Sequence, residues 1–416
     1  MIYRIKKKDR SLKGKLFLSG SKSISNRVLI IEALSNSSFG KKNIANAKDT
    51  VLLQQLLREE SFRLSSSQNI FDAQDAGTTF RFLTAYLAFK EGEWFITGSE
   101  RMRQRPISDL VTALKQLGAE ISFPERENFP PLKITGGKLH GDFVRVNANI
   151  SSQFVSALLM IAPCLPNGLT IELAGNVVSE PYIEMTLTLM KYFGVNHTRS
   201  VNSIHVDHQQ YQPKDVFIES DWSAASYYYE MATFADEVDF ELNGLLRNSF
   251  QGDSVIAQFM KSFGVETEFI PDGSGETIHL KKTHSHPPSH LHLQQFPDLA
   301  PALFVTAAGL SQKISFSGLE HLAYKESNRE EAMRNELAKC GISITNANGN
   351  ISVEGNFSAK HPRFSTYGDH RMAMAFAPLA ILCDKVEIED PMVVNKSYPK
   401  FWDDLKAIGF EIEIIM

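Results

Sequence analysis

The sequence has little of what marks secreted or membrane-spanning proteins. It contains three cysteines in 416 residues, without CxxC spacing, so we expect buried, reduced thiols rather than a disulfide framework. No apolar run reaches the roughly 18 residues that a transmembrane helix needs. The opening MIYRIKKK lacks the apolar stretch of a signal peptide. These absences predict a cytoplasmic protein.

Excess positive charge is missing as well. The formal net charge is −5, so no general basic field attracts nucleic acid or anionic lipid, and we expect neither as a partner. No GxGxxG or GxxxxGK[ST] motif follows a predicted strand, as a nucleotide-binding loop would require. The His-rich stretch 284–292 contains Pro-Pro, which is typical of a loop, and we expect no metal there. Anions must then be bound by local groups of Lys and Arg.

A pattern of roughly 70 residues recurs along the chain, too long for a solenoid repeat. Six polar segments, starting near residues 21, 75, 151, 221, 296 and 369, each open an apolar helix that we expect to be buried on all sides. The pattern predicts six α/β units, three in each of two domains, or else an ordinary α/β protein with evenly spaced helices. Amphipathic helices between these segments are predicted to end at C-cap glycines, namely Gly118, Gly194, Gly264, Gly341 and Gly409.

The polar segments also carry cations beside Gly, Ser, Thr or Asn. Free N–H groups and the helix dipole favour anions at helix starts, and Arg adds bidentate recognition of carboxylate or phosphate. Each segment taken alone has an ordinary explanation, such as a solvated cap or a helix-surface ion pair. Their recurrence indicates ligands with several anionic groups. The charged residues are Lys22, Arg27, Arg81, Arg105, Lys325, Glu326, Arg329, His370 and Arg371.

These motifs resemble the signatures of the 5-enolpyruvylshikimate-3-phosphate (EPSP) synthase family. They follow the family order across nearly the whole chain, and together they are highly specific. The matching segments are LSGSKSISNR (18–27), DAGT (75–78), RQRPI (103–107), SSQF (151–154), SEPY (179–182), RNSFQGD (247–253), PD (297–298), KESNR (325–329), YGDHRMAM (367–374) and KSYP (396–399).

The resemblance implies an α/β fold of two domains, each with three βαβαββ units whose buried helices point at an interdomain cleft. We place one domain at residues 1–19 with 222–416 and the other at 20–221. The implied reaction transfers the enolpyruvyl group of phosphoenolpyruvate (PEP) to the 5-hydroxyl of shikimate 3-phosphate and releases phosphate, in the shikimate pathway of aromatic amino acid biosynthesis. The resemblance implies no metal and no organic cofactor, and we expect a monomer.

The resemblance also implies a role for individual residues. Asp298 is the implied general base, while Glu326 and Lys22 are alternatives for the acid that protonates PEP. A carboxylate beside several cations should be ionised, as a base must be. The implied shikimate 3-phosphate ligands are Lys22, Ser23, Arg27, Ser151, Ser152, Gln153, Ser179, Tyr182, Asp298 and Lys325; the implied PEP ligands are Lys22, Gly77, Arg105, Gln153, Arg329, Arg371 and Lys396.

Two other functions stay open. A sister enolpyruvyl transferase acting on UDP-N-acetylglucosamine shares the fold, but it uses a Lys-Asn opening and a loop cysteine, whereas Ser23 follows Lys22 here and no cysteine lies near Arg105. A non-catalytic anion-binding homologue would not need the intact set of charged residues. Departures from the family pattern occur at Ser19, Asp75, Phe82, Glu180 and His321, and we leave His321, where Asn is usual, out of the site.

Overall fold

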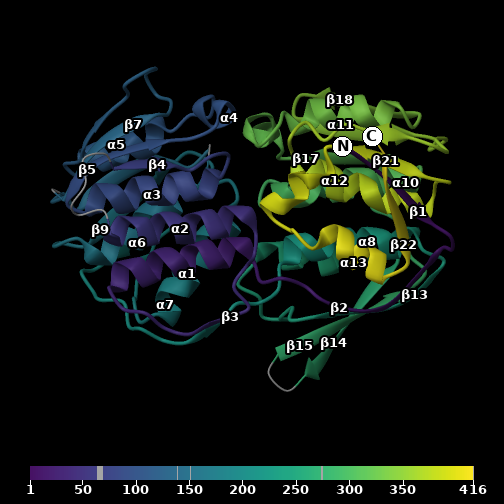
Figure 1. The fold of residues 1–416 in the computed structure, drawn as a ribbon, viewed down its shortest axis with the longest axis horizontal. Helices are drawn as coiled ribbons and strands as arrows, with labels where there is room; N and C mark the ends of the chain where they lie inside the picture. The colour runs from purple at the N-terminus through teal and green to yellow at the C-terminus, as the bar shows by residue number, and fades with distance from the viewer. Residues whose placement is uncertain (63–68, 138, 150, 273–274, 416) are drawn as a thin grey trace. The chain divides into compact units, whose positions relative to one another are not determined.

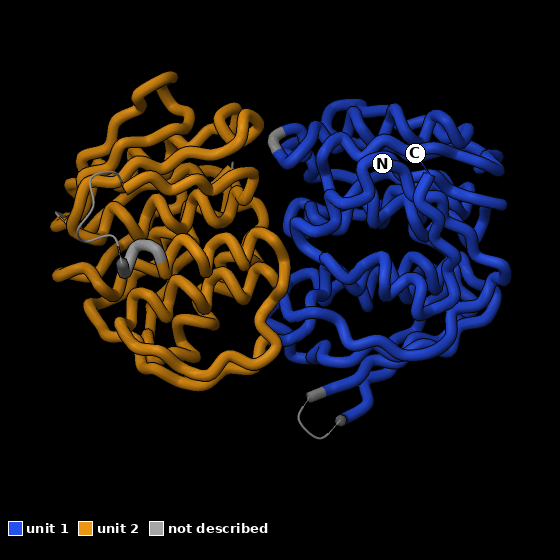
Figure 2. The backbone as a smooth tube through the Cα atoms, in the orientation of Figure 1, with its two compact units in different colours: residues 1–21, 219–416 blue, residues 22–218 orange. Residues whose placement is uncertain are grey.

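The structure is a computed structural model that describes residues 1–62, 69–137, 139–149, 151–272 and 275–415 (Figure 1). These residues form two compact units (Figure 2). Unit 1 is Met1–Ser21 with Glu219–Met416, and unit 2 is Lys22–Ile218. The sequence-based limits at 19 and 221 stay predictions of where separate domains end. None of the helices in the described part of the chain is long and apolar enough to cross a membrane.

Unit 1 contains three four-stranded sheets in its described residues, ordered β20-β21-β1-β22, β14-β15-β13-β2 and β16-β17-β19-β18. Because β1 pairs antiparallel with both β21 and β22, the first residues of the chain complete a sheet of its C-terminal half. The strands are β1 (Ile2–Lys7), β2 (Ser11–Phe17), β13 (Glu237–Asn243), β14 (Val265–Asp272), β15 (Gly275–Lys282), β16 (His290–His292), β17 (Ile314–Ser317), β18 (Ile342–Ala347), β19 (Asn350–Gly355), β20 (Arg363–Phe364), β21 (Val386–Glu389) and β22 (Phe410–Ile415).

The helices of unit 1 pack on one another and on these sheets around a single apolar core. Its α-helices are α8 (Trp222–Phe234), α9 (Ile256–Lys261), α10 (Ala300–Gly309), α11 (Arg329–Ala338), α12 (His370–Phe376) and α13 (Phe401–Ala407), and its 3-10 helices are η2 (Gly252–Val255), η3 (Pro297–Leu299), η4 (Glu320–Tyr324), η5 (Ala377–Ile381) and η6 (Pro391–Lys396).

Unit 2 has two four-stranded sheets, β10-β11-β9-β8 and β4-β5-β7-β6, and a two-stranded parallel sheet of β12 and β3 among its described residues. Its strands are β3 (Lys41–Lys42), β4 (Ile70–Asp72), β5 (Gly92–Thr97), β6 (Glu120–Ser122), β7 (Leu132–Gly136), β8 (Phe143–Asn147), β9 (Leu169–Ala174), β10 (Thr198–Arg199), β11 (Ser203–Val206) and β12 (Val216–Phe217); its helices are α1 (Lys22–Ser35), α2 (Lys48–Phe62), α3 (Gly77–Phe89), α4 (Glu100–Arg103), α5 (Ser108–Gln116), α6 (Ser152–Ile161), α7 (Glu180–Tyr192) and η1 (Ala162–Cys164).

The six polar segments do open helices, namely α1, α3, α6, α8, η3 and α12. Ser151, Asp221 and Asp369 are N-caps whose side chains accept a hydrogen bond from the N–H two residues ahead. Asp75 is not a cap, because Ala76 takes that position before α3, and the Asp75 carboxylate lies 3.8 Å from Lys48 Nζ instead.

The apolar helices behind these caps are buried as predicted. Every residue of α12, and of α10 from Ala300 to Ala308, is buried. The predicted C-cap glycines all have positive φ, between 80° and 99°, as a left-handed cap requires; they are Gly118, Gly194, Gly264, Gly341 and Gly409.

The apolar core of unit 1 contains the side-chain carboxylate of Glu230. Glu230 lies on α8 and is fully buried, and neither of its oxygens has a hydrogen-bond partner among the described residues. Its neighbours Tyr228 and Tyr229, in contrast, bond to Tyr398 and Thr267. Because burial disfavours the charged form, the pKa of Glu230 is raised well above 4.5.

Replacing Glu230 by Gln is expected to stabilise the protein more at pH 8 than at pH 5. Glu230 holds its proton more tightly in the folded protein than in the unfolded chain. The free energy of unfolding of the wild-type protein is therefore highest, as far as Glu230 is concerned, below the unfolded pKa near 4.5, and it decreases as the pH rises above that value. Denaturant titrations should therefore show an advantage in the free energy of unfolding for Glu230→Gln that is clearly larger at pH 8 than at pH 5.

The matched control is Glu237→Gln, because the Glu237 side chain is exposed and pairs with Lys13 at 2.6 Å. Its effect on the free energy of unfolding should be nearly the same at both pH values. An equally flat difference for Glu230→Gln would show that Glu230 is ionised in the folded protein.

Candidate active site

In unit 2, the first turn of α1 presents Lys22 and Ser23. The Lys22 ammonium lies 3.2 Å from a carboxylate oxygen of Asp49, which occupies the first turn of α2. The other Asp49 oxygen is buried and has no partner among the described residues. Asp49 was not among the predicted site residues. This ion pair holds the Lys22 side chain against the start of α2.

Arg27 lies one turn further along α1 and is almost completely buried. Its guanidinium group donates to Thr186 Oγ1 at 2.7 Å, to Ser156 Oγ at 3.1 Å and to the carbonyls of Ser23 and Tyr182. No carboxylate lies among these partners, and burial lowers the pKa of Arg27 to about 10. Arg27 therefore joins α1 to α6 and α7, and direct contact with a ligand stays a prediction.

Two guanidinium groups converge on the start of α3. A Cβ atom on Gly77 would lie 2.6 Å from Arg105 Nη1 and 2.7 Å from Arg81 Nη1, so both groups rest against the glycine backbone. Arg81 also donates to Gln153 Oε1 at 2.7 Å, and Gln153 Nε2 donates to Thr78 Oγ1 at 3.1 Å. Two cations at a helix N-terminus form a place for an anion. Arg81 was recognised as a cation of this segment, but it was not predicted as a site residue.

The remaining predicted residues of unit 2 lie at the starts of α6 and α7. Ser151 accepts from Gln153 N at 3.3 Å, and Ser152 is buried at the start of α6. Ser179 has a left-handed backbone, with φ of 55°, at the start of α7. The Tyr182 carbonyl accepts from Arg27. Glu180, where the family pattern often has a cation, forms an ion pair with Arg199.

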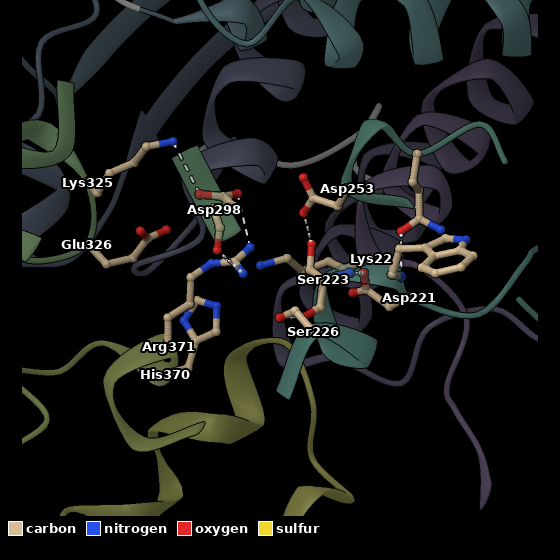
Figure 3. Close-up of polar contacts among 12 residues, drawn as sticks. Lys22, Asp221, Ser223, Ser226, Asp253, Asp298, Lys325, Glu326, His370 and Arg371 are labelled. Atoms are coloured by element: carbon tan, nitrogen blue, oxygen red, sulfur yellow. Dashed lines mark hydrogen bonds and ion pairs between the residues drawn. The ribbon is translucent and has the colours of Figure 1, made fainter. Parts of the chain in front are cut away.

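In unit 1, Asp298 lies in η3 and is surrounded by three cations, two of which, Lys325 and Arg371, are shown in Figure 3. One carboxylate oxygen lies 3.0 Å from Arg329 Nη1 and 3.4 Å from Lys325 Nζ, and the other lies 3.0 Å from Arg371 Nη2. Burial alone would raise the pKa of Asp298, but Arg371, Lys325 and Arg329 outweigh burial and hold the pKa well below its ordinary value. Asp298 is therefore ionised, as predicted from its cationic neighbours.

Arg329 is 1% exposed and binds three carboxylates at once. Besides Asp298, it donates through Nε to Asp369 Oδ2 at 2.8 Å and through Nη2 to Glu326 Oε2 at 2.7 Å. The other Asp369 oxygen caps α12 and accepts from Arg371 N at 2.9 Å. The Asp369 carboxylate thus binds the guanidinium group of Arg329 and the backbone N–H of Arg371. It thereby fixes the positions of both arginines around Asp298.

Two residues near Asp298, Asp253 and His321, were not predicted as site residues. Asp253 accepts a short hydrogen bond from Ser223 Oγ, and burial, with the charge of Asp298, raises its pKa to about 6. His321 has a pKa lowered to about 4 by burial and by Lys325, so it is neutral. Asp253 lies in the RNSFQGD motif, which was the one available signal for it. Lys396, which was predicted, is buried at the end of η6.

The predicted site residues are thus divided between the two units. Lys22, Gly77, Arg105 and Gln153 belong to unit 2, with the predicted serines and Tyr182, and Asp298, Lys325, Glu326, Arg329, Arg371 and Lys396 belong to unit 1. No group of His, Cys, Asp or Glu suited to hold a metal ion occurs in the described part of the chain. His290 and His292 instead contact the hydroxyls of Ser315 and Ser317.

Comparison with known proteins places this arrangement in a family. The family model for "EPSP synthase (3-phosphoshikimate 1-carboxyvinyltransferase)" matches residues 6–405. A 3-phosphoshikimate 1-carboxyvinyltransferase of Bacteroides fragilis is 44% identical over 408 residues, 97% of each chain. One from Vibrio campbellii is 34% identical over 421 residues, 96% of this chain and 97% of the relative.

Solved structures agree on the fold. An EPSP synthase of Acinetobacter baumannii matches with a TM-score of 0.79 and 20% sequence identity, and the match covers 99% of this chain and 100% of that one. This likeness confirms the predicted two-domain α/β fold class. Sequence matches over nearly the full length and the shared fold give one answer: the chain belongs to the EPSP synthase family.

Proposed function

We propose that the protein transfers the enolpyruvyl group of PEP to the 5-hydroxyl of shikimate 3-phosphate and releases phosphate, as a 3-phosphoshikimate 1-carboxyvinyltransferase. Family membership supports this activity. The observation that carries the proposal is Asp298, an ionised carboxylate held by Lys325, Arg329 and Arg371. Such a site combines a base with cations for anionic substrates, and clamping two anions side by side supplies the entropic part of catalysis.

In the proposed mechanism, Asp298 removes the proton of the 5-hydroxyl, and the oxygen attacks C2 of PEP while C3 gains a proton. The proton at C3 comes from Lys22 or Glu326. The Lys22 side chain is held by Asp49, and Glu326 forms an ion pair with Arg329, which also contacts Asp298. The tetrahedral adduct then loses phosphate and a methyl proton, which restores the double bond. This chemistry balances without a redox or metal cofactor.

The proposed ligand assignments follow the two groups of cations. PEP is bound by residues of both units. They are Lys22, Gly77, Arg105 and Gln153 of unit 2 and Arg329, Arg371 and Lys396 of unit 1. The two guanidinium groups at Gly77 support an anion at the start of α3. The working form is a cytoplasmic monomer, and Lys22 and Gln153 contact both substrates. Shikimate 3-phosphate is bound by Lys22, Ser23, Arg27, Ser151, Ser152, Gln153, Ser179, Tyr182, Asp298 and Lys325.

One experiment separates the three candidate functions. Phosphate release from PEP is measured with shikimate 3-phosphate, with UDP-N-acetylglucosamine and with neither. We expect release only with shikimate 3-phosphate. Release with the nucleotide sugar alone would identify the sister transferase, and binding of anions without release in any mixture would identify a non-catalytic homologue.

Ligand binding is expected to make the protein more compact. Substrates with several negative charges are proposed to bind residues of both units at once, so binding should draw the units together. Small-angle scattering should therefore give a smaller radius of gyration when shikimate 3-phosphate is added. An unchanged scattering profile at saturating ligand would count against this expectation.

A further inference from the structure

The two arginines of unit 1 that should receive PEP, Arg329 and Arg371, are already paired with carboxylates of the protein. We call the six residues concerned the Asp298 cluster, and they are Asp298, Lys325, Glu326, Arg329, Asp369 and Arg371. Their ion pairs join three positive side chains to three carboxylates. An anionic ligand therefore has to compete with a carboxylate of the protein for its cations.

The geometry decides which carboxylate can give way. Asp369 is fully buried, contacts Arg329 and caps α12, so removing it would break a helix start. Asp298 contacts both arginines, through Arg329 Nη1 and Arg371 Nη2, and its side chain is 18% exposed. Asp298 is the carboxylate that contacts both guanidinium groups, and its side chain, unlike that of Asp369, is partly exposed.

We propose that Asp298 is an internal competitor of PEP: in the free protein it occupies Arg329 and Arg371, and the carboxylate of PEP displaces it from both. The proposal rests on the proposed function, because it assigns the arginines to PEP. It goes further by making the base available only after that substrate has bound.

The neighbouring charges favour exchange over simple addition of the ligand. An added anion beside an ionised Asp298 would place like charges together at low dielectric. Two other titratable groups near Asp298, His321 and Asp253, supply no positive charge that could offset an added anion. His321 is neutral because its pKa is lowered to about 4, and Asp253 is negative above a pKa of about 6. Exchange keeps the charge balance of the cluster, whereas addition does not.

Exchange also explains how Asp298 becomes a useful base. Three cations depress its pKa and favour its charged form, so a carboxylate held in this way has little tendency to accept a proton. Loss of both arginine contacts raises the pKa of Asp298 toward the range in which a general base works. The 5-hydroxyl would then be deprotonated only when PEP is in place to be attacked.

The test uses PEP alone, without an acceptor, so that no turnover occurs. Binding is measured by calorimetry in a buffer free of phosphate and sulfate, for the wild-type protein and Asp298→Asn. Removing the internal competitor, which forms ion pairs with both arginines, should tighten PEP binding by roughly fivefold to fiftyfold. The control Glu354→Gln removes the same charge from an exposed pair with Lys313 and should leave the affinity unchanged. Unchanged or weaker binding by a folded Asp298→Asn would overturn the proposal.

A second measurement needs no variant. In a crystal structure of the wild-type protein with PEP, Asp298 should lie beyond 4 Å from Arg371 Nη2, compared with 3.0 Å here. Retention of both arginine contacts beside bound PEP would overturn the proposal even if the variant did not fold. A failure of the proposed function looks different, because the wild-type protein would then release no phosphate from PEP and shikimate 3-phosphate.

Discussion

Asp298→Asn is expected to lower kcat by roughly 10²–10⁴, the usual contribution of a general base. The change keeps the size of the side chain and its place in η3, but it removes the proton acceptor. Binding of shikimate 3-phosphate should largely survive, because most of its proposed ligands are other residues. Steady-state kinetics, together with binding of shikimate 3-phosphate by calorimetry, separates loss of catalysis from loss of binding.

Asp253→Asn is the matched control for this variant. It also removes a buried carboxyl of unit 1, but Asp253 contacts Ser223 rather than the cations that hold Asp298. We therefore expect a much smaller change in kcat. A kcat for Asp298→Asn within about threefold of the wild-type value would show that another group is the base.

The helix starts could be predicted because their chemistry is local. Ser151, Asp221 and Asp369 bond to an N–H only two residues away, so a short stretch of sequence contains both partners. The C-cap glycines follow the same rule, since a left-handed residue is needed at one position. Asp75 shows the limit of the rule, because the neighbouring Ala76 became the cap.

The pairing of charges could not be predicted in this way. Asp298 meets Arg329 and Arg371, which lie 31 and 73 residues away, and only the packing of η3, α11 and α12 brings them together. Arg27 shows the same limit. Its guanidinium group donates to Thr186 and Ser156, which lie 159 and 129 residues away, and its contact with a ligand stays a prediction.

Gly77→Ala is expected to raise the KM for PEP by roughly 5–150-fold, which corresponds to an overpacking cost of about 1–3 kcal/mol. The new methyl group would lie 2.6 Å from Arg105 Nη1 and 2.7 Å from Arg81 Nη1, closer than real contacts allow. Both groups are ends of flexible side chains, so the protein can fold by moving them. Arg105 would then be displaced from its place at the start of α3. The KM for shikimate 3-phosphate should change much less.

A double-mutant cycle with Arg105→Ala tests whether the effect passes through Arg105. In that background the methyl group no longer meets Arg105 but still lies 2.7 Å from Arg81 Nη1, so Gly77→Ala should raise the KM for PEP by less than it does in the wild-type background. Full additivity of the two changes would contradict this explanation. If instead Gly77→Ala alone left the KM for PEP unchanged, Gly77 and Arg105 would not form part of the PEP site.

Inhibition by glyphosate gives a further measure of the same pocket. The family resemblance implies that glyphosate competes with PEP and is slightly longer, so a methyl group on Gly77 should penalise glyphosate more than the substrate. The ratio of the glyphosate Ki to the KM for PEP is therefore expected to rise in Gly77→Ala.

The comparison is made with the wild-type form of this protein, because Phe82, on the same helix, replaces a residue that is usually Pro in the family. Phe82 therefore influences the glyphosate sensitivity of the wild-type protein. Phe82 is buried and lies 5.3 Å from the Arg27 guanidinium. An unchanged ratio with a raised KM would mean that both ligands depend on Arg105 alone and that neither touches the glycine.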